Sequence, residues 1–183
     1  DISKGLVAPF PKMPMELRDG AKGDEGAMAI LRAPAGDADI SCLFKYSAQG
    51  MGHGHFDRLA YSLYDGSTEV LQDYGSARWV NIDQKSGGGY LKENQSWAKQ
   101  SLANNTVVVD QRSQFGGSTK KANPFHADPW FFDASNKHVQ IVSGKELNAY
   151  EGVELHRTLC LLTDEAFEKP ILLDVFRVQS EET

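Results

Sequence analysis

The clearest pattern in the sequence is Val153-Glu154-Leu155-His156-Arg157-Thr158-Leu159-Cys160-Leu161-Leu162. Apolar side chains recur on one face of this stretch, namely Val153, Leu155, Leu159 and Leu161. Polar side chains stand between them, namely Glu154, His156 and Thr158. A period of two is typical of a strand that buries one face and exposes the other. The stretch therefore predicts a half-buried β-strand.

Similar short runs, separated by turn residues, occupy much of the remaining chain. They are Ala27–Ala33, Ile40–Tyr46, Leu59–Tyr64, Glu69–Tyr74, Thr106–Asp110, Val139–Ser143 and Ile171–Val178. Asp65-Gly66 lies between two of these runs and is a strong hairpin signal. Helical signals are weak, and Glu93–Leu102 has room for one or two turns. Many short strands with Gly, Asp and Asn turns predict an all-β fold, an antiparallel β-sandwich.

The chain has 183 residues, which suggests one domain or a piece of a larger protein. Residues 1–25 are predicted to be a linker segment leading into the domain, because several prolines interrupt regular structure there. Residues 26–183 are the predicted β-sandwich domain, and we expect both ends to have been cut from a longer protein. The stretches 83–100 and 111–137 are too long for tight turns and are predicted to be functional loops.

The composition excludes some classes of protein. Lys and Arg number 19 against 25 Asp and Glu, so the formal net charge is −6. This balance argues against a dedicated nucleic-acid-binding protein, although a local basic pocket for an anionic substrate is compatible with it. No apolar run approaches the roughly 20 residues of a membrane span. Cys42 and Cys160 are too few for a disulfide framework; we expect two buried free thiols, with a disulfide pair as the alternative.

The densest polar cluster is Gly50-Met51-Gly52-His53-Gly54-His55-Phe56-Asp57. If residues 53–57 are extended, His53, His55 and Asp57 point to one face. Three titratable groups on one face need partners or a metal ion. The alternative is a solvated glycine-rich loop with incidental histidines.

Three further clusters each allow two interpretations. In Leu71–Trp79, Asp73 is either a turn initiator or a metal ligand, and Arg78 is suited to clamp a carboxylate. In Gly87-Gly88-Gly89-Tyr90, the phenol is either presented by a glycine-rich loop or packed against the domain. Asn104–Asp110 taken alone predicts a turn that runs into a strand.

The aromatic run Asp128-Pro129-Trp130-Phe131-Phe132 is expected to belong to the core, with a sugar-stacking face as the alternative. The serines lack the context of a nucleophile elbow, and the chain has neither a P-loop nor a dinucleotide-binding glycine pattern. The sequence therefore predicts no organic cofactor.

Taken in order, these clusters resemble the heparinase II/III-like C-terminal β-sandwich domain, and most closely the family seventeen polysaccharide lyases, the oligoalginate lyases. The resemblance extends roughly from Met15 to Val178. Each motif alone is weak, whereas their joint order and spacing are specific. The motifs are Glu16–Gly20, Lys45-Tyr46, His53–Asp57, Leu71–Arg78, Gly89–Leu91, Asn105–Asp110, Leu155–Leu159 and Asp174–Arg177.

The resemblance implies a structural zinc ion held by His55 and Asp73. The family's third ligand is a histidine, and the matching residue here is Asn104. Because an amide is a poor zinc ligand, we expect zinc binding to be weakened or lost. Two alternatives stay open: a harder cation bound through the Asn104 oxygen, or a hydrogen bond from Asn104 to Asp73 in place of the metal.

The resemblance also implies roles in catalysis. His53 and Arg78 are expected at the substrate, and Tyr90 is expected to act as catalytic acid and base, with His53 beside it. The reaction of the family is β-elimination on a uronate polymer, which requires the charge of the substrate carboxylate to be neutralised while the neighbouring C5 proton is removed. Cationic neighbours favour a phenolate, so a tyrosine near them can take that proton.

The resemblance thus implies an exolytic (oligo)alginate lyase. The alternatives are a heparinase-type glycosaminoglycan lyase and a non-catalytic carbohydrate-binding β-sandwich that stacks sugars on Trp79, Trp97, Trp130 and Tyr90. The expected partners are an anionic polysaccharide and an N-terminal (α/α) toroid of the same protein, which this chain lacks. We expect the isolated 183 residues to be inactive and the whole protein to be periplasmic or extracellular.

Overall fold

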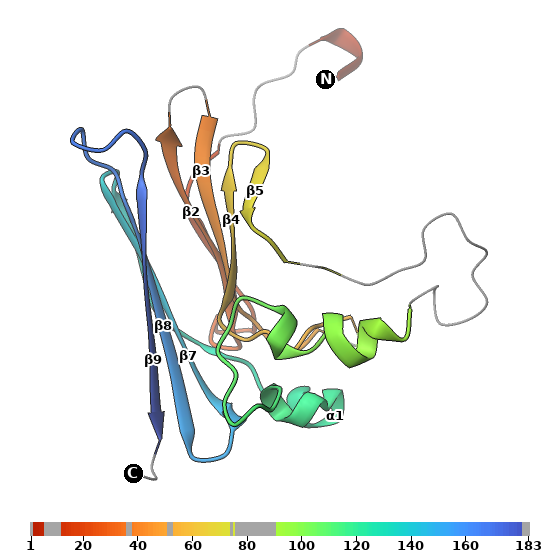
Figure 1. Ribbon diagram of the computed structural model, residues 1–183. Helices are drawn as coiled ribbons and strands as arrows, with labels where there is room; N and C mark the ends of the chain where they lie inside the picture. Colours follow the sequence, from red (N-terminus) through yellow and green to blue (C-terminus); the bar gives the residue numbers. More distant parts are fainter. Residues whose placement is uncertain are drawn as a thin grey trace.

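The computed structural model describes residues 2–5, 12–35, 38–50, 53–73, 75 and 91–180. Two antiparallel sheets face each other (Figure 1). The five-stranded sheet has the order β1 (Met15–Arg18), β2 (Ala27–Ala35), β3 (Ala38–Tyr46), β4 (Ala60–Asp65) and β5 (Thr68–Leu71). The four-stranded sheet has the order β6 (Asp128–Asn136), β7 (Val139–Tyr150), β8 (Val153–Leu162) and β9 (Ile171–Ser180). The predicted antiparallel β-sandwich is confirmed.

Short helical segments precede β1 or lie between the two sheets in the sequence. They are the 3-10 helices η1 (Ile2–Lys4), η4 (Ser101–Ala103) and η5 (Gln114–Gly117), the π-helical turn η3 (Asn94–Ala98) and the α-helix α1 (Thr119–Ala122). Segment η3 lies within the stretch Glu93–Leu102, where one or two helical turns were expected, and η4 extends one residue beyond it. All but η1 gather near one end of the sandwich (Figure 1).

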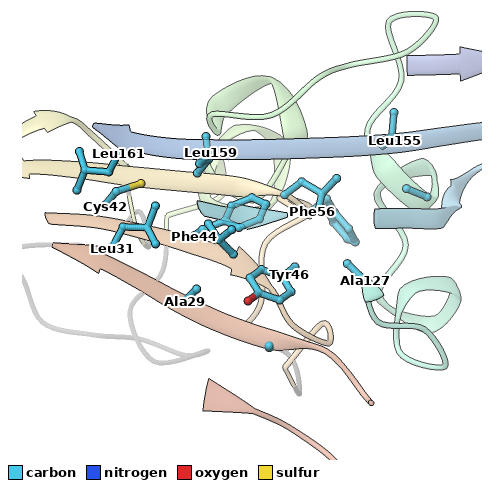
Figure 2. Packing of buried hydrophobic residues seen from close by; sticks show 14 of the residues in the cluster. Ala29, Leu31, Cys42, Phe44, Tyr46, Phe56, Ala127, Leu155, Leu159 and Leu161 are labelled. Carbon is cyan, nitrogen blue, oxygen red and sulfur yellow. The ribbon is translucent and has the colours of Figure 1, made fainter. Parts of the chain in front are cut away.

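The core lies between the sheets. In β8, Leu155, Leu159 and Leu161 are buried, whereas His156, Thr158 and Cys160 on the other face are partly exposed, as the alternating pattern predicts. Figure 2 shows these leucines opposite the inward side chains of the five-stranded sheet, Leu31 and Phe44 among them. Burial of such side chains, each worth about 1.5–3 kcal/mol, holds the two sheets together.

The apolar face of β8 also contains a charged residue, Arg157, which is buried. Its guanidinium forms a bidentate pair with Asp174 of β9, with Nε–Oδ1 and Nη2–Oδ2 distances of 2.9 and 2.6 Å. Its Nη1 donates to the carbonyl oxygens of Leu59 and Asn105. The buried charge is therefore fully paired and links β8 to the loops of the opposite sheet.

Both cysteines are free, as expected. Cys42 is buried in the core beside Leu31 (Figure 2), and burial raises the pKa of its thiol to about 12. Cys160 is half-buried on the outer face of β8, and burial raises its pKa as well. Neither thiol is activated for chemistry, because the reactive form is the thiolate.

Several expectations about individual elements were wrong. Thr106–Asp110 forms no strand, because Asp110 and Gln111 have φ values of 51° and 58° and turn the chain back toward the bridge between Val109 and Arg112. The run Glu69–Tyr74 forms a strand only as far as Leu71. The stretch 111–137 is not one long loop, since it contains η5, α1 and β6.

Strand β6 also corrects the interpretation of the aromatic run. Phe132 packs against the core, whereas Trp130 and Phe131 are 59% and 46% exposed. The core assignment thus holds for one of the three aromatics. Strand β1 lies within the predicted linker segment 1–25 and pairs with β2. The placement of the domain boundary at residue 25 stays a prediction.

Candidate functional site

Three side chains that can bind a metal ion meet beside the five-stranded sheet. His55 and Asp57 lie in the loop that joins β3 to β4, and Asp73 follows β5. One ligand atom from each residue lies within 4.8 Å of the others. His55 and Asp57 are buried, and Asp73 is half-buried. The geometry therefore brings together two residues of one glycine-rich loop and one residue of a distant turn.

Close backbone packing sets the shape of the loop that carries His55. The amides of His53 and Gly54 donate to the carbonyl oxygen of Gly50 at 3.2 and 2.9 Å, which forms a turn. A Cβ atom on Gly54 would lie only 1.4 Å from the Gln49 carbonyl oxygen, so this position requires glycine. The segment 53–57 is therefore not an extended strand. His53 is exposed in the turn, apart from the group of His55, Asp57 and Asp73, which corrects the expected single face.

The same loop is anchored to the helical segments through Phe56. The Phe56 amide donates to the Lys99 carbonyl oxygen at 2.8 Å, and the hydroxyl of Ser101 donates to the Phe56 carbonyl oxygen. These bonds flank His55 on its C-terminal side. The imidazole is therefore held by an ordered backbone, which favours a fixed ligand geometry.

Asp57 carries its own cationic partner. The Lys45 Nζ lies 2.5 Å from Asp57 Oδ1, and the carboxylate side chain is only 5% exposed. Lys45 is on β3, and its side chain points to the outer face of the five-stranded sheet. The ammonium offsets the charge of one of the two carboxylates in the group, so a metal ion would share Asp57 with Lys45.

Asn104 lies against His55. Its Nδ2 donates to the carbonyl oxygens of Gln100 and Ala98 at 2.7 and 3.4 Å. The amide oxygen therefore faces His55, and Asn104 Oδ1 lies 3.3 Å from His55 Nδ1. In a neutral imidazole this contact places the proton on Nδ1 and leaves the lone pair on Nε2. Asn104 thus engages His55, whereas Asp73 Oδ1 accepts from the Gly75 amide at 2.7 Å.

Asn105 holds the third member of the group in place. Its Nδ2 donates to the Tyr61 carbonyl oxygen of β4 and to the Gln72 carbonyl oxygen, both at 3.1 Å. The second bond fixes the backbone immediately before Asp73. Sequence reasoning did not assign this role, because an asparagine before a strand-like run reads as a turn residue.

A pocket of about 260 Å³ opens beside the two carboxylates on the outer face of the five-stranded sheet. Its walls combine charged, hydroxyl and apolar groups, among them Met28, Leu43, Lys45, Asp57, Tyr61, Ser62 and Asp73. One imidazole and two carboxylates are a donor set that divalent cations such as zinc accept. The residues present therefore fit a metal ion. Asp57 joins His55 and Asp73 in the group, as the residue pattern 53–57 suggested, although the family resemblance did not assign it as a ligand.

The other predicted site residues could not be placed beside this group. Arg78 and Tyr90, together with Trp79, lie outside the described residues. Their assignments as substrate-binding and catalytic residues stay predictions, as does that of His53.

The sequence is similar to those of known proteins over nearly its whole length. A sequence model of the family described as heparinase II/III-like, C-terminal matches residues 15–183. A protein of Saccharophagus degradans named exo-oligoalginate lyase is 42% identical over 180 residues. A protein of Stenotrophomonas maltophilia named alginate lyase is 44% identical over 180 residues. Each alignment covers 98% of this chain but only 24% of the relative, so the chain spans about a quarter of these proteins.

Solved structures agree on the fold. The heparan sulfate lyase HepC from Pedobacter heparinus superposes with a TM-score of 0.68 at 14% identity, covering 98% of this chain and 24% of that one. A heparinase III superposes with a TM-score of 0.66 at 15% identity, covering 97% and 24% respectively. At these identities the likeness establishes the shared β-sandwich alone.

Proposed function

The chain belongs to the heparinase II/III-like C-terminal family, and we propose that it forms the β-sandwich part of a polysaccharide lyase that cleaves alginate or its oligomers by β-elimination. The observation that carries the proposal is 42–44% identity to two alginate lyases over 98% of this chain. Identity at this level over nearly the whole chain supports a shared substrate class, whereas a heparinase III and the heparan sulfate lyase HepC share 16% and 14% with it. The acidic net charge of −6 also favours an unsulfated polyuronate over a sulfated one.

The reaction removes the C5 proton of a uronate and expels the oxygen at C4, leaving a C4–C5 double bond. Negative charge develops on the carboxylate next to C5 as the proton leaves. We assign the stabilisation of that charge to Arg78 and His53, because a guanidinium binds a carboxylate bidentately and an imidazole donates to it. Tyr90 takes the proton and returns one to the departing oxygen. We also propose that the enzyme acts from one end of the chain, as the name of one relative states for that protein.

We propose that His55, Asp57 and Asp73 hold a structural zinc ion. The support is the proximity of their ligand atoms, within 4.8 Å, and the burial of His55 and Asp57. A bound dication would offset the carboxylate charge and fasten the loop carrying His55 to the segment after β5. Asn104 contributes by holding His55 Nδ1, so that Nε2 is left as the ligand atom. Because His53 lies two residues before His55, a fixed His55 also restrains the residue assigned to the substrate.

No helix within the described ranges has the length and apolar character needed to cross a membrane. A polymer such as alginate is met outside the cytoplasm or after import, and we propose a periplasmic or extracellular location for the whole protein. The anionic polysaccharide and a further domain of the same protein are its proposed partners.

The test is the ultraviolet absorbance of the new double bond, measured on the full-length protein with alginate oligomers and with heparan sulfate in parallel. We expect absorbance to rise with alginate alone. The rate of this rise should be lower when a chelator removes the metal ion. A rise with heparan sulfate alone would transfer the assignment to a glycosaminoglycan lyase. No rise with either polymer, from a folded protein, would refute the lyase assignment.

A second candidate function is carbohydrate binding without turnover. The observation that favours it is the exposure of Trp130 and Trp97, at 59% and 41%, since exposed indole rings stack on sugars. Measuring turnover and affinity of the wild-type protein and of Tyr90→Phe separates the two functions. A lyase turns the polymer over as wild type, and its Tyr90→Phe variant loses turnover while retaining affinity. A binding module shows affinity without turnover in both forms.

A further inference from the structure

A second pocket lies at the end of the sandwich where η5 and α1 meet the C-terminal end of β7. Its volume is about 510 Å³, within the range typical of sites for small ligands. It shares no lining residue with the pocket beside Asp57 and Asp73. Figure 1 places α1 near the turn between β7 and β8, at the lower end of the molecule as drawn.

The pocket is basic on a chain that is acidic overall. Arg112, Lys120 and Lys121 line it, and the acidic group among the lining residues is Glu151. The cationic side chains therefore outnumber the acidic one, although the whole chain has a net charge of −6. A local positive potential against the overall charge is the mark of a site for an anion.

Aromatic side chains form the apolar part of the same pocket. Phe115 and Phe125 stack at 6.1 Å with an interplanar angle of 10°, and Tyr150 completes the lining from β7. Phe125 is 39% exposed, so part of its ring is open to a ligand. Aromatic faces pack against the C–H faces of sugar rings, while cations pair with carboxylates or other acidic groups.

Hydrogen bonds and ion pairs with neighbouring residues support the walls of the pocket. The Arg58 guanidinium, fully buried, donates to the Phe125 carbonyl oxygen at 2.9 Å and lies 5.5 Å from the Phe115 ring centroid. Arg58 also pairs with the buried Glu146, with an Nε–Oε2 distance of 3.3 Å. Glu146 in turn accepts from the amide of Asn148, a lining residue, at 2.6 Å. Arg112 is held from the other side, because the Tyr150 hydroxyl donates to its carbonyl oxygen at 3.0 Å.

The loop that forms one wall is strained. Leu59, Asp110, Gln111 and Phe115 are the non-glycine residues with positive φ in the described part of the chain. Three of these four lie in the loop 110–117. Left-handed backbone costs roughly 1–2 kcal/mol for such residues and persists where the surrounding structure enforces it, often at ligand sites.

We propose that this pocket, formed by Arg112, Lys120, Lys121 and the aromatic rings of Phe115, Phe125 and Tyr150, is a second saccharide-binding site that takes a carboxylated sugar. The cations recognise the carboxylate and the rings pack against the sugar. The choice of uronate among carboxylated sugars rests on the proposed function. Such a site would hold a second stretch of the polymer or a released product at a distance from His55 and Asp73.

The test follows amide hydrogen exchange by mass spectrometry in the full-length protein carrying Tyr90→Phe, which suppresses turnover. The probe is a mannuronate disaccharide. We expect exchange to slow in peptides covering residues 108–125 and 145–152, by about tenfold when the ligand is present at about ten times its Kd. A neutral mannose disaccharide and inorganic phosphate, at the same concentration, should leave these peptides unchanged.

Variants locate the binding. The double substitution Lys120→Ala/Lys121→Ala is expected to abolish slowing in residues 108–125 and to leave any slowing in residues 53–73 in place. Lys137→Ala, which removes an exposed lysine in the turn between β6 and β7, is the matched control and should change neither region. Slowing that survives the double substitution would overturn the proposal.

The remaining outcomes are equally decisive. Equal slowing by phosphate would show a general anion site and refute sugar recognition, and no slowing by the disaccharide would refute the site. The absorbance assay on the wild-type protein separates this inference from the proposed function. An active lyase without slowing at the pocket overturns the second site alone, whereas slowing at the pocket without elimination overturns the lyase assignment alone.

Discussion

Arg157 illustrates how one buried charge can be tolerated in an apolar face. Its guanidinium meets both oxygens of Asp174 and two backbone carbonyls, so each nitrogen finds a partner. It also lies 4.5 and 5.0 Å from the ring centroids of Tyr61 and Phe176. The residue joins both sheets to the loop containing Asn105, next to the candidate metal group.

Replacing Arg157 by Met is expected to destabilise the protein by about 3–5 kcal/mol, because Asp174 and two carbonyls lose their buried partner. Urea unfolding followed by circular dichroism measures the change. Arg177→Met is the matched control on β9, since Arg177 pairs with Glu154 on the exposed surface at 2.9 Å and its loss should cost less than about 1 kcal/mol. Equal losses in the two variants would contradict the role of Arg157.

Asn104 occupies the position at which the family resemblance implies a histidine ligand. The amide oxygen meets His55 Nδ1, and the amide nitrogen is held by two carbonyls. Replacing Asn104 by Ala removes the oxygen that holds His55 Nδ1, and we expect zinc affinity in the full-length protein to fall about tenfold. Equilibrium dialysis with metal analysis measures the affinity. Asn136→Ala, at the exposed end of β6, should leave the affinity unchanged, and no loss from Asn104→Ala would contradict the metal assignment.

The site could be predicted from the sequence only in part. The resemblance indicated His55, Asp73 and Asn104, and the structure brings these residues together. The residues alone suggested that His53 shares a face with His55, but the turn at Gly50 separates them. Lys45 and Asn105 had no assigned role, because each acts through a contact with a residue distant in the sequence.

At the scale of single elements, alternation was the reliable signal. Strands β2, β3, β4, β7, β8 and β9 lie where alternating or apolar runs predicted them, although β7 extends seven residues beyond Ser143. Strand β1 was missed because it is short and directly follows Pro14, in a stretch where prolines argue against regular structure. Strand β6 was missed because Pro129 and consecutive aromatics hide any alternation, and its register shifts at Phe131.

The outer face of the four-stranded sheet makes stability depend on pH. His156 of β8 lies beneath Trp130 of β6, with ring centroids 6.0 Å apart, and its Nε2 is 2.7 Å from the Ser143 hydroxyl oxygen of β7. Burial lowers its pKa below the ordinary 6.5, and the nearby charges of Lys145 and Arg177 lower it further, against a smaller opposing effect of Glu154. The folded state therefore binds this proton less readily than the unfolded state.

Because the unfolded chain takes up the proton first, His156 stabilises the fold above about pH 6.5 and loses that contribution as the pH falls below it. We expect the stability advantage of the wild-type protein over His156→Gln to be largest near pH 8 and to shrink toward pH 5. Urea unfolding at a series of pH values measures the difference. His138→Gln, an exposed histidine, is the control. A constant advantage of the wild type across the series would contradict the lowered pKa.

At the scale of the whole molecule, the part of the sandwich that the structure describes offers binding groups without enclosing a substrate. The pocket beside Asp57 and Asp73 is open, with a volume of about 260 Å³, and it lies on one face of a single sheet. Enzymes that remove a weakly acidic proton surround the reacting ring with charge-stabilising groups and exclude water. The curated relatives are about four times as long as this chain, since it covers 24% of each.

We therefore expect the isolated 183-residue chain to fold but to release no unsaturated uronate from alginate oligomers, because it spans only about a quarter of its relatives and the pocket beside Asp57 and Asp73 is open. Near-ultraviolet circular dichroism of the chain checks that the aromatic core is ordered, and absorbance of the double bond checks turnover. The full-length protein at the same molar concentration is the positive control. Turnover by the isolated chain at a rate comparable to the full-length protein would mean that the sandwich alone neutralises the carboxylate and moves the proton, and the remaining three quarters of such proteins would then serve binding rather than chemistry.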